Sequence, residues 1–217
     1  MSESVRIVPA LLTDNGADLA GMVRLANTFT DFVQIDLMDG VFVPPVSIGA
    51  ADLAGIEIRF RWEVHLMVSR PSQHIAGFVR AGAERVTVHI EADEDIRTAI
   101  GLARELGVGV GVALNPETPV SRIETLLPVI DTVLLLTVEP GYYGSPFLPE
   151  VLPKVGEVRA MWPEGTVAVD GGVKEQNLLE VARTGVDEIC VGSAIFRAAD
   201  PVAAYRRFQR LAQRIRD

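Results

Sequence analysis

The chain has 217 residues, of which 48% are hydrophobic and 23% are charged, and its formal net charge is −9. A chain of this length and composition can bury one large core, so we expect a single domain over residues 1–217. The acidic balance disfavours nucleic acid or an anionic membrane as a partner, and favours a small ligand that is held by local groups.

Apolar runs and helical periodicity alternate along the whole chain. They predict strands at residues 5–12, 33–40, 62–68, 84–90, 108–114, 132–138, 166–169 and 187–191. They predict helical segments at residues 17–28, 50–55, 71–81, 93–106, 119–127, 149–161, 174–184 and 201–216. Eight strands, each followed by a helical segment, are the expectation for an α/β fold closed into a (β/α)8 TIM barrel. A doubly wound open sheet is the alternative, and it is disfavoured because no G-x-G-x-x-G motif follows the first strand.

Cysteine content and the first residues bear on where the protein works. The one cysteine, Cys190, lies in an apolar run and allows no internal disulfide, so we interpret it as a small core residue in a reducing compartment. The N-terminal residues lack the basic segment and apolar run of a secretory signal, and no stretch of about 18 apolar residues occurs. We therefore expect a cytoplasmic protein without a membrane partner.

Three of the predicted strands carry an ionisable side chain at or near the end. Asp36 lies in the second strand, His65 in the third and Asp170 at the end of the seventh. A charge inside an apolar strand costs several kcal/mol unless a partner or a chemical role compensates for it. The carboxyl ends of barrel strands share one mouth, where active sites lie. We therefore predict that the three side chains meet there, and we interpret His74 and His89 as structural or supporting residues.

The order of strands around the ring sets the expected separation of the two aspartates. The seventh and second strands are three steps apart, so Asp36 and Asp170 are expected nearly opposite each other with room for a small substrate between them. That arrangement suits proton removal on one face of a substrate and proton delivery on the other. It disfavours a retaining glycosidase, whose carboxylates approach within about 5.5 Å.

Glycines gather in the turns after the last three predicted strands. Main-chain N–H groups in such turns, and at the start of a following helix, bind anions, and the loops after strands seven and eight often hold phosphate in this fold. Tight turns alone would also account for single glycines. We predict a phosphorylated ligand held by Gly141, Tyr142, Tyr143, Gly144, Gly171, Gly172, Gly192 and Ser193. Met38 and Met67 are expected to line the cavity as soft apolar side chains.

Distinctive motifs are spread over nearly the whole chain. They are Pro-Ala-Leu-Leu at 9–12, Ile-Asp-Leu-Met-Asp-Gly-Val-Phe-Val-Pro at 35–44, Val-His-Leu-Met-Val at 64–68, Ala-Leu-Asn-Pro-Glu-Thr-Pro at 113–119, Thr-Val-Glu-Pro-Gly at 137–141, Val-Asp-Gly-Gly-Val at 169–173 and Gly-Ser-Ala-Ile-Phe at 192–196. With these motifs the chain resembles the ribulose-phosphate 3-epimerase family. The resemblance implies a homo-oligomeric ribulose-phosphate-binding barrel that interconverts ketose phosphates such as D-ribulose 5-phosphate and D-xylulose 5-phosphate at C3. Asp36 and Asp170 would be the acid/base pair, acting through a metal-stabilised cis-enediolate.

The resemblance also implies a divalent metal ion, which could be zinc, iron, manganese or magnesium, on Asp36, His65 and Asp170. The family usually has a histidine as fourth ligand where this chain has Gln34, whose neutral amide oxygen is a weaker donor. A serine that usually contacts the substrate is Ala10 here. Such departures concentrate at the mouth while both aspartates remain, so we favour an active enzyme with altered metal use or an altered sugar phosphate.

Two alternatives stay open. The first is a barrel that binds a phosphosugar without turnover. The second is a metal-assisted aldolase or isomerase, which also needs an enediolate and a grip on phosphate. A Schiff-base aldolase is disfavoured because the only lysines, Lys154 and Lys174, are both predicted to lie in helices rather than at strand ends.

Overall fold

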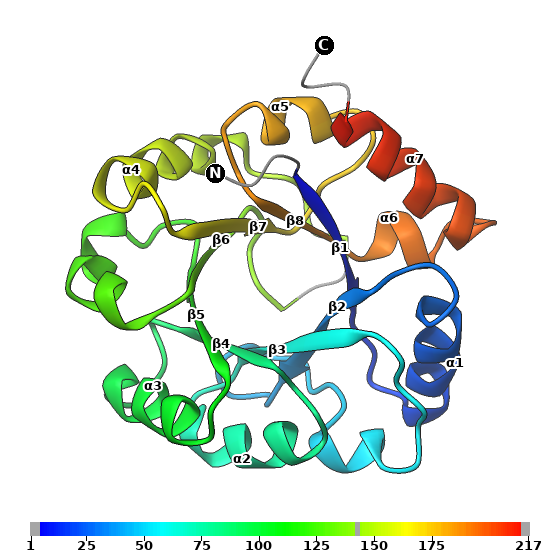
Figure 1. Ribbon diagram of the computed structural model, residues 1–217, viewed down its shortest axis with the longest axis horizontal. Helices are drawn as coiled ribbons and strands as arrows, with labels where there is room; N and C mark the ends of the chain where they lie inside the picture. Colours follow the sequence, from blue (N-terminus) through cyan, green and yellow to red (C-terminus); the bar gives the residue numbers. More distant parts are fainter. Residues whose placement is uncertain (1–4, 142–143, 214–217) are drawn as a thin grey trace.

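The strands close into a ring that is surrounded by helices in the computed structural model (Figure 1). The structure describes residues 5–141 and 144–213. In this described part, eight parallel strands pair in chain order, and the last pairs with the first. They are β1 (Arg6–Leu11), β2 (Phe32–Met38), β3 (Arg61–Met67), β4 (Arg85–His89), β5 (Gly109–Leu114), β6 (Thr132–Leu136), β7 (Thr166–Asp170) and β8 (Glu188–Val191). The predicted TIM barrel is confirmed, and the open sheet is excluded.

Helical segments follow the strands around the outside of the ring (Figure 1). They are α1 (Gly16–Ala26), η1 (Ala50–Leu53), α2 (Ser72–Arg80), α3 (Ile96–Glu105), η2 (Val120–Val129), η3 (Pro149–Val151), α4 (Pro153–Met161), α5 (Leu178–Ala182), α6 (Ser193–Phe196) and α7 (Pro201–Gln213). Within the described part of the chain, no helix combines the length and the apolar character that crossing a membrane requires.

Two connections differ from the sequence prediction in the kind or length of helix. The segment after β5 is a 3-10 helix that contains Pro128, a residue without the N–H that an α-helix needs. The helix predicted at 174–184 is only five residues long. It starts late because the Asn177 side chain accepts a hydrogen bond from the main-chain N–H of Lys174 at 2.7 Å and holds a turn there. Residues 214–216, the end of the last predicted helix, lie outside the described residues.

Both faces of the barrel strands are buried, which explains why the strands are almost continuous apolar runs. Every residue of β2 is buried, including Gln34 and Asp36. One apolar cluster lies between the strands and the helices, and a smaller one fills part of the ring with Val8, Ala10, Phe32, Ala113, Leu134, Leu136, Ala168 and Cys190. The smaller cluster leaves both ends of the ring to polar side chains.

A buried ion cluster fills the amino-terminal end of the barrel. Arg85, at the start of β4, donates to Glu63 through Nε at 2.6 Å and through Nη2 at 2.9 Å. The same Nη2 donates to Glu188 of β8 at 2.5 Å, and Nη1 donates to Thr132 of β6 at 3.0 Å. One guanidinium thus links β4 to three other strands. It neutralises the buried carboxylate of Glu63 and shares that of Glu188 with Arg6, which lies 3.6 Å from it.

Candidate active site at the carboxyl end of the barrel

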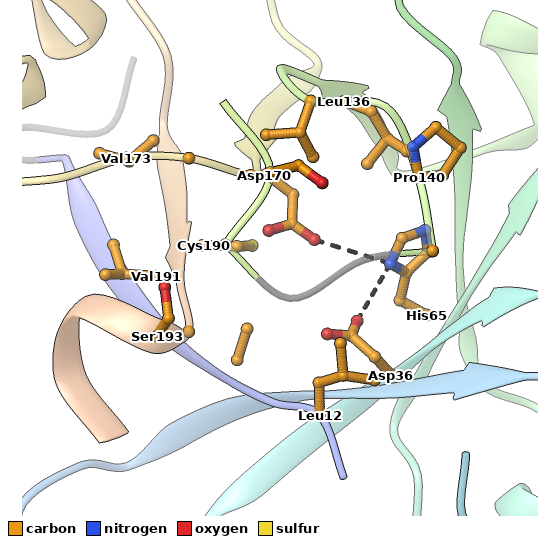
Figure 2. Close-up of a pocket in the computed structure, with 18 of the residues that line it drawn as sticks. Leu12, Asp36, His65, Leu136, Pro140, Asp170, Val173, Cys190, Val191 and Ser193 are labelled. Carbon is orange, nitrogen blue, oxygen red and sulfur yellow. Dashed lines mark hydrogen bonds and ion pairs between the residues drawn. The ribbon is translucent and has the colours of Figure 1, made fainter. Parts of the chain in front are cut away.

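Three ionisable side chains come together at the carboxyl ends of β2, β3 and β7. Asp36 and His65 are register partners on adjacent strands, and Asp170 is the last residue of β7. Figure 2 shows both carboxylates directed toward the imidazole of His65. The distance from His65 Nδ1 is 3.1 Å to Asp36 Oδ1 and 3.7 Å to Asp170 Oδ2. The structure therefore brings together the three residues that the strand ends single out.

The two carboxylates are closer than the sequence argument predicts. One ligand atom from each of Asp36, His65 and Asp170 lies within 4.8 Å of the others. The strands β2 and β7 are far apart around the ring, but the two aspartate side chains point inward to shared hydrogen-bond partners. The prediction of room for a substrate between the two carboxylates is therefore wrong, because their facing oxygens are too close together. A substrate has to lie over the cluster. The separation of the carboxylates, by itself, does not exclude a retaining glycosidase.

Gln34 forms a hydrogen bond to each of the two aspartates. Its Nε2 donates to Asp36 Oδ1 at 2.8 Å and to Asp170 Oδ2 at 2.7 Å. Its Oε1 accepts a hydrogen bond from the thiol of Cys190 at 3.1 Å, which fixes the direction of the amide. In this structure Gln34 is therefore a donor to both carboxylates. Cys190 is buried, as expected, but it has a role in the site that the sequence did not reveal.

His65 has a second set of partners on the side away from the aspartates. Its Nε2 lies 2.9 Å from Nε2 of His89 at the end of β4. Nδ1 of His89 lies 3.1 Å from Oε2 of Glu91. His89 was expected to be structural or supporting, whereas Glu91 was not singled out. Its spacing of two residues from His89 is the signal that could have shown that both face one side of the strand end.

The buried groups perturb one another's protonation. Burial, together with the nearby charge of Asp36, raises the pKa of Asp170 to about 7. Burial lowers the pKa of His89 to about 4. Burial also acts to lower the pKa of His65, but the hydrogen bond to Asp36 and the charges of both aspartates outweigh it and raise that pKa. A buried carboxyl such as Asp170, whose pKa is raised by burial and by a neighbouring charge, is typical of acid/base sites.

A cavity lies over this cluster, and most of the predicted ligand-binding residues line it. They are Met67, Gly141, Gly144, Gly171, Gly172, Gly192 and Ser193. Figure 2 shows Ser193 at the side of the cavity away from His65. Met38 does not line the cavity; it is buried in a small apolar cluster with Val43 and Met67. Tyr142 and Tyr143 lie outside the described residues.

The glycine turns bring main chain close to the cavity in a way that other residues could not. Gly171 has a φ of +109°, and a Cβ built there would lie 2.4 Å from Cγ2 of Val138. Gly172 has a φ of +66°, and its Cβ would lie 2.8 Å from Cα of Phe147. Both positions need glycine, because the positive φ disfavours any residue with a side chain and because a Cβ atom would collide with the neighbouring atoms. The loop after β7 therefore presents bare backbone to the cavity.

The residues of the cluster fit a divalent metal ion. Two carboxylate oxygens and one imidazole nitrogen form a set of three protein ligands, the number that catalytic metal sites use while leaving positions open for substrate. The other ring nitrogen of His65 has a hydrogen-bond partner of its own, as metal-bound histidines do. The candidate ligands are thus Asp36, His65 and Asp170.

The fold and the placement of the cavity define the class of protein. Similar solved structures include 3-hexulose-6-phosphate synthase from Salmonella typhimurium, with a TM-score of 0.74 and 21% identity over 97% of this chain and 100% of that one. Another is orotidine 5'-phosphate decarboxylase from Pyrococcus horikoshii, with a TM-score of 0.67 and 16% identity over 98% of this chain and 100% of that one. At these identities the likeness shows the fold alone. The chain is a TIM barrel with its ionisable cluster at the mouth where active sites of this fold lie.

Sequence comparison narrows this class to one family. The model of the ribulose-phosphate 3 epimerase family matches residues 6–196. Relatives named ribulose-phosphate 3-epimerase include one from Synechocystis sp., 35% identical over 97% of this chain and 96% of its own length, and one from Bacillus subtilis, 36% identical over 90% and 94%. The chain belongs to the ribulose-phosphate 3-epimerase family, and with it to the isomerases that act on carbohydrate phosphates. The resemblance of the motifs is confirmed.

Proposed function

We propose that the protein epimerises a ketose phosphate at C3, with D-ribulose 5-phosphate and D-xylulose 5-phosphate as the first pair to test. The observation that carries the proposal is the pair Asp36 and Asp170, which reach one cavity from β2 and β7. Hydrogen bonds within the cluster use Asp36 Oδ1 and Asp170 Oδ2. Each carboxylate therefore keeps its other oxygen for a proton of the substrate.

Inversion at C3 needs one group to remove a proton and another to return a proton to the opposite face. Asp36 and Asp170 take these roles in turn, and the substrate between the two steps is a planar enediolate. Asp170 is suited to hold a proton, since burial and the charge of Asp36 raise its pKa to about 7. A divalent metal ion held by Asp36, His65 and Asp170 would supply Lewis-acid stabilisation to the oxyanion that develops on the substrate.

The proposed phosphate-binding site lies in the loops after β7 and β8. Gly171, Gly172, Gly192 and Ser193 line the same cavity as the aspartates, and bare N–H groups in such turns suit an anion. Because the chain carries a net charge of −9, its overall field opposes an anionic substrate. Local main-chain groups must therefore provide the attraction.

Replacing Ser193 by aspartate is expected to raise the KM for a sugar phosphate by about tenfold or more, a loss of about 1.4 kcal/mol. A carboxylate at this position would repel the phosphate without touching the acid/base pair. The measurement is steady-state kinetics with kcat and KM determined separately. Ser193→Asn is the matched control, since it adds similar bulk without charge. Equal KM values in the two variants would show that the phosphate binds elsewhere.

Replacing Gln34 by histidine is expected to tighten binding of a divalent metal ion by about tenfold or more, because imidazole is a better ligand than an amide. The change also removes the two N–H bonds that Gln34 gives to the carboxylates. Competition with a chromophoric chelator measures the affinity. Gln34→Leu removes the same two bonds without adding a ligand, so it separates the two effects. A histidine variant that binds metal no better than wild type would argue against a site at this cluster.

Epimerisation itself is tested by product analysis. Purified protein is incubated in turn with zinc, manganese, iron or magnesium and with pentulose and hexulose 5- and 6-phosphates, and the products are identified by NMR. Formation of the C3 epimer supports the proposal. Carbon–carbon cleavage would indicate an aldolase. Thermal stabilisation by the sugar phosphate without any conversion would indicate a binding protein.

A further inference from the structure

The hydrogen bonds of His65 continue away from the cavity through a buried chain of three side chains. His65 Nε2 lies 2.9 Å from His89 Nε2, and His89 Nδ1 lies 3.1 Å from Glu91 Oε2. Both imidazoles are fully buried, and their ring centroids lie 5.1 Å apart with an interplanar angle of 27°. Phe42 covers His89 with its ring centroid 4.7 Å away. The chain therefore runs from the metal-ligand cluster to a carboxylate through a region that excludes water.

Glu91 fixes the acceptor end of this chain. Its Oε1 accepts a hydrogen bond from the main-chain N–H of Asn115 at 2.9 Å. Burial acts to raise the pKa of Glu91, but hydrogen bonds from His89, Thr118 and the N–H of Asn115 outweigh it and hold that pKa below its usual value. Glu91 is therefore a carboxylate that only accepts hydrogen bonds.

An accepting carboxylate determines where each imidazole carries its proton. Glu91 favours a proton on Nδ1 of His89, because Nδ1 lies 3.1 Å from Glu91 Oε2 and can donate to it. Nε2 of His89 is then bare and accepts from Nε2–H of His65. In this structure Nδ1 of His65 lies 3.1 Å from Asp36 Oδ1, where a proton on Nδ1 is donated to that carboxylate. A bound metal ion would take the place of this proton, and the remaining ring proton of His65 would then be on Nε2, facing His89. Nδ1 is the atom that faces Asp36 and Asp170, and a ring nitrogen must be bare to bind a metal ion.

We propose that His89 and Glu91 are positioning residues, which fix His65 in the tautomer that presents a bare Nδ1 to a metal ion. The inference rests on the metal site of the proposed function. Outer partners of a metal-bound histidine set its orientation and its basicity, and their loss costs about 10- to 100-fold in metal affinity. Here the outer partner is itself a histidine, and a carboxylate orients it in turn.

The decisive variant is Glu91→Gln, which keeps an oxygen for the Asn115 N–H but removes the charge. Its affinity for zinc or cobalt, measured by competition with a chelator, is expected to fall about 10- to 100-fold. Glu94→Gln is the matched control. Glu94 is a nearby acid that accepts hydrogen bonds from the N–H of Ser72 at 2.8 Å and from its hydroxyl at 2.7 Å, away from both histidines. Its metal affinity is expected to equal that of wild type.

A second measurement reads the tautomer directly. In ¹⁵N NMR spectra of the zinc-loaded wild type, His89 is expected to carry its proton on Nδ1 and His65 on Nε2. Glu91→Gln is expected to remove this preference at His89, because an amide can donate as well as accept. A purely structural role for Glu91 would lower stability without changing the protonated nitrogen.

The outcomes separate this inference from the proposal on which it rests. Absence of metal binding by the wild type would contradict the metal site itself. Metal binding that is equally tight in the wild type and in Glu91→Gln would overturn the role of the positioning residues and leave the site standing. An equal loss of affinity in Glu94→Gln, or a proton on Nε2 of His89, would also overturn it.

Discussion

Asp170→Asn is expected to lower the rate of epimerisation by about 100- to 10,000-fold, the contribution of a general acid or base. Asparagine has nearly the same shape and keeps an oxygen, but it cannot exchange a proton with C3. The same size of effect is expected for Asp36→Asn. The rate of epimerisation is measured in both directions, starting from each epimer in turn. Far-ultraviolet circular dichroism checks that each variant is folded.

The two variants are also expected to differ in a way that a shared structural defect would not produce. When one aspartate is lost, the other can still exchange the C3 proton of the epimer that it faces, although conversion to the second epimer stops. Solvent deuterium should therefore enter one epimer in Asp36→Asn and the other in Asp170→Asn. Asp131→Asn, on an exposed residue that is paired with Arg104, is the control. Full activity in either active-site variant would rule out the two-aspartate mechanism.

Arg85→Met is expected to lower the free energy of unfolding by about 3–5 kcal/mol, the cost of leaving a buried ion cluster without one partner. Its guanidinium bonds to Glu63, Glu188 and Thr132 at once, and its side chain is only 13% exposed. Methionine fills part of the volume but leaves the buried carboxylate of Glu63 without its arginine, and it leaves Glu188 with the more distant Arg6, at 3.6 Å. Chemical denaturation followed by circular dichroism gives the free energy.

Arg61→Met is the matched control for this prediction. Arg61 bonds to Glu84 at 2.6 Å, but its side chain is 67% exposed, and such surface pairs contribute at most about 1 kcal/mol. A small effect at Arg61 beside a large one at Arg85 would show that burial, and not the count of ion pairs, decides the stability. Similar small effects in both variants would contradict the structural role of the cluster.

The fold could be predicted because its signals are local. Apolar runs buried on both faces alternate with helical periodicity, and eight repeats leave few ways to cover the strands. Asp36, His65 and Asp170 could be singled out for the same reason, since each interrupts or ends an apolar run. The 3-10 helix after β5 was missed because periodicity alone does not distinguish it from an α-helix.

The finer structure of the site depends on contacts that no local pattern contains. Gln34 and Cys190 are 156 residues apart, and only closure of β8 onto β1 brings the thiol to the amide oxygen. That contact turns the Gln34 nitrogen toward the carboxylates, to which it donates. The approach of the two aspartates within one cluster likewise depends on side-chain direction, which the order of strands does not specify.

The central claim is that two aspartates exchange protons with one carbon of a bound ketose phosphate. The most direct test is NMR of D-ribulose 5-phosphate incubated in D₂O with the wild-type protein and a divalent metal ion. We expect loss of the C3 proton signal together with the appearance of deuterated D-xylulose 5-phosphate. Retention of the C3 proton with zinc, manganese, iron and magnesium alike, for this substrate and for the related ketose phosphates, would contradict it.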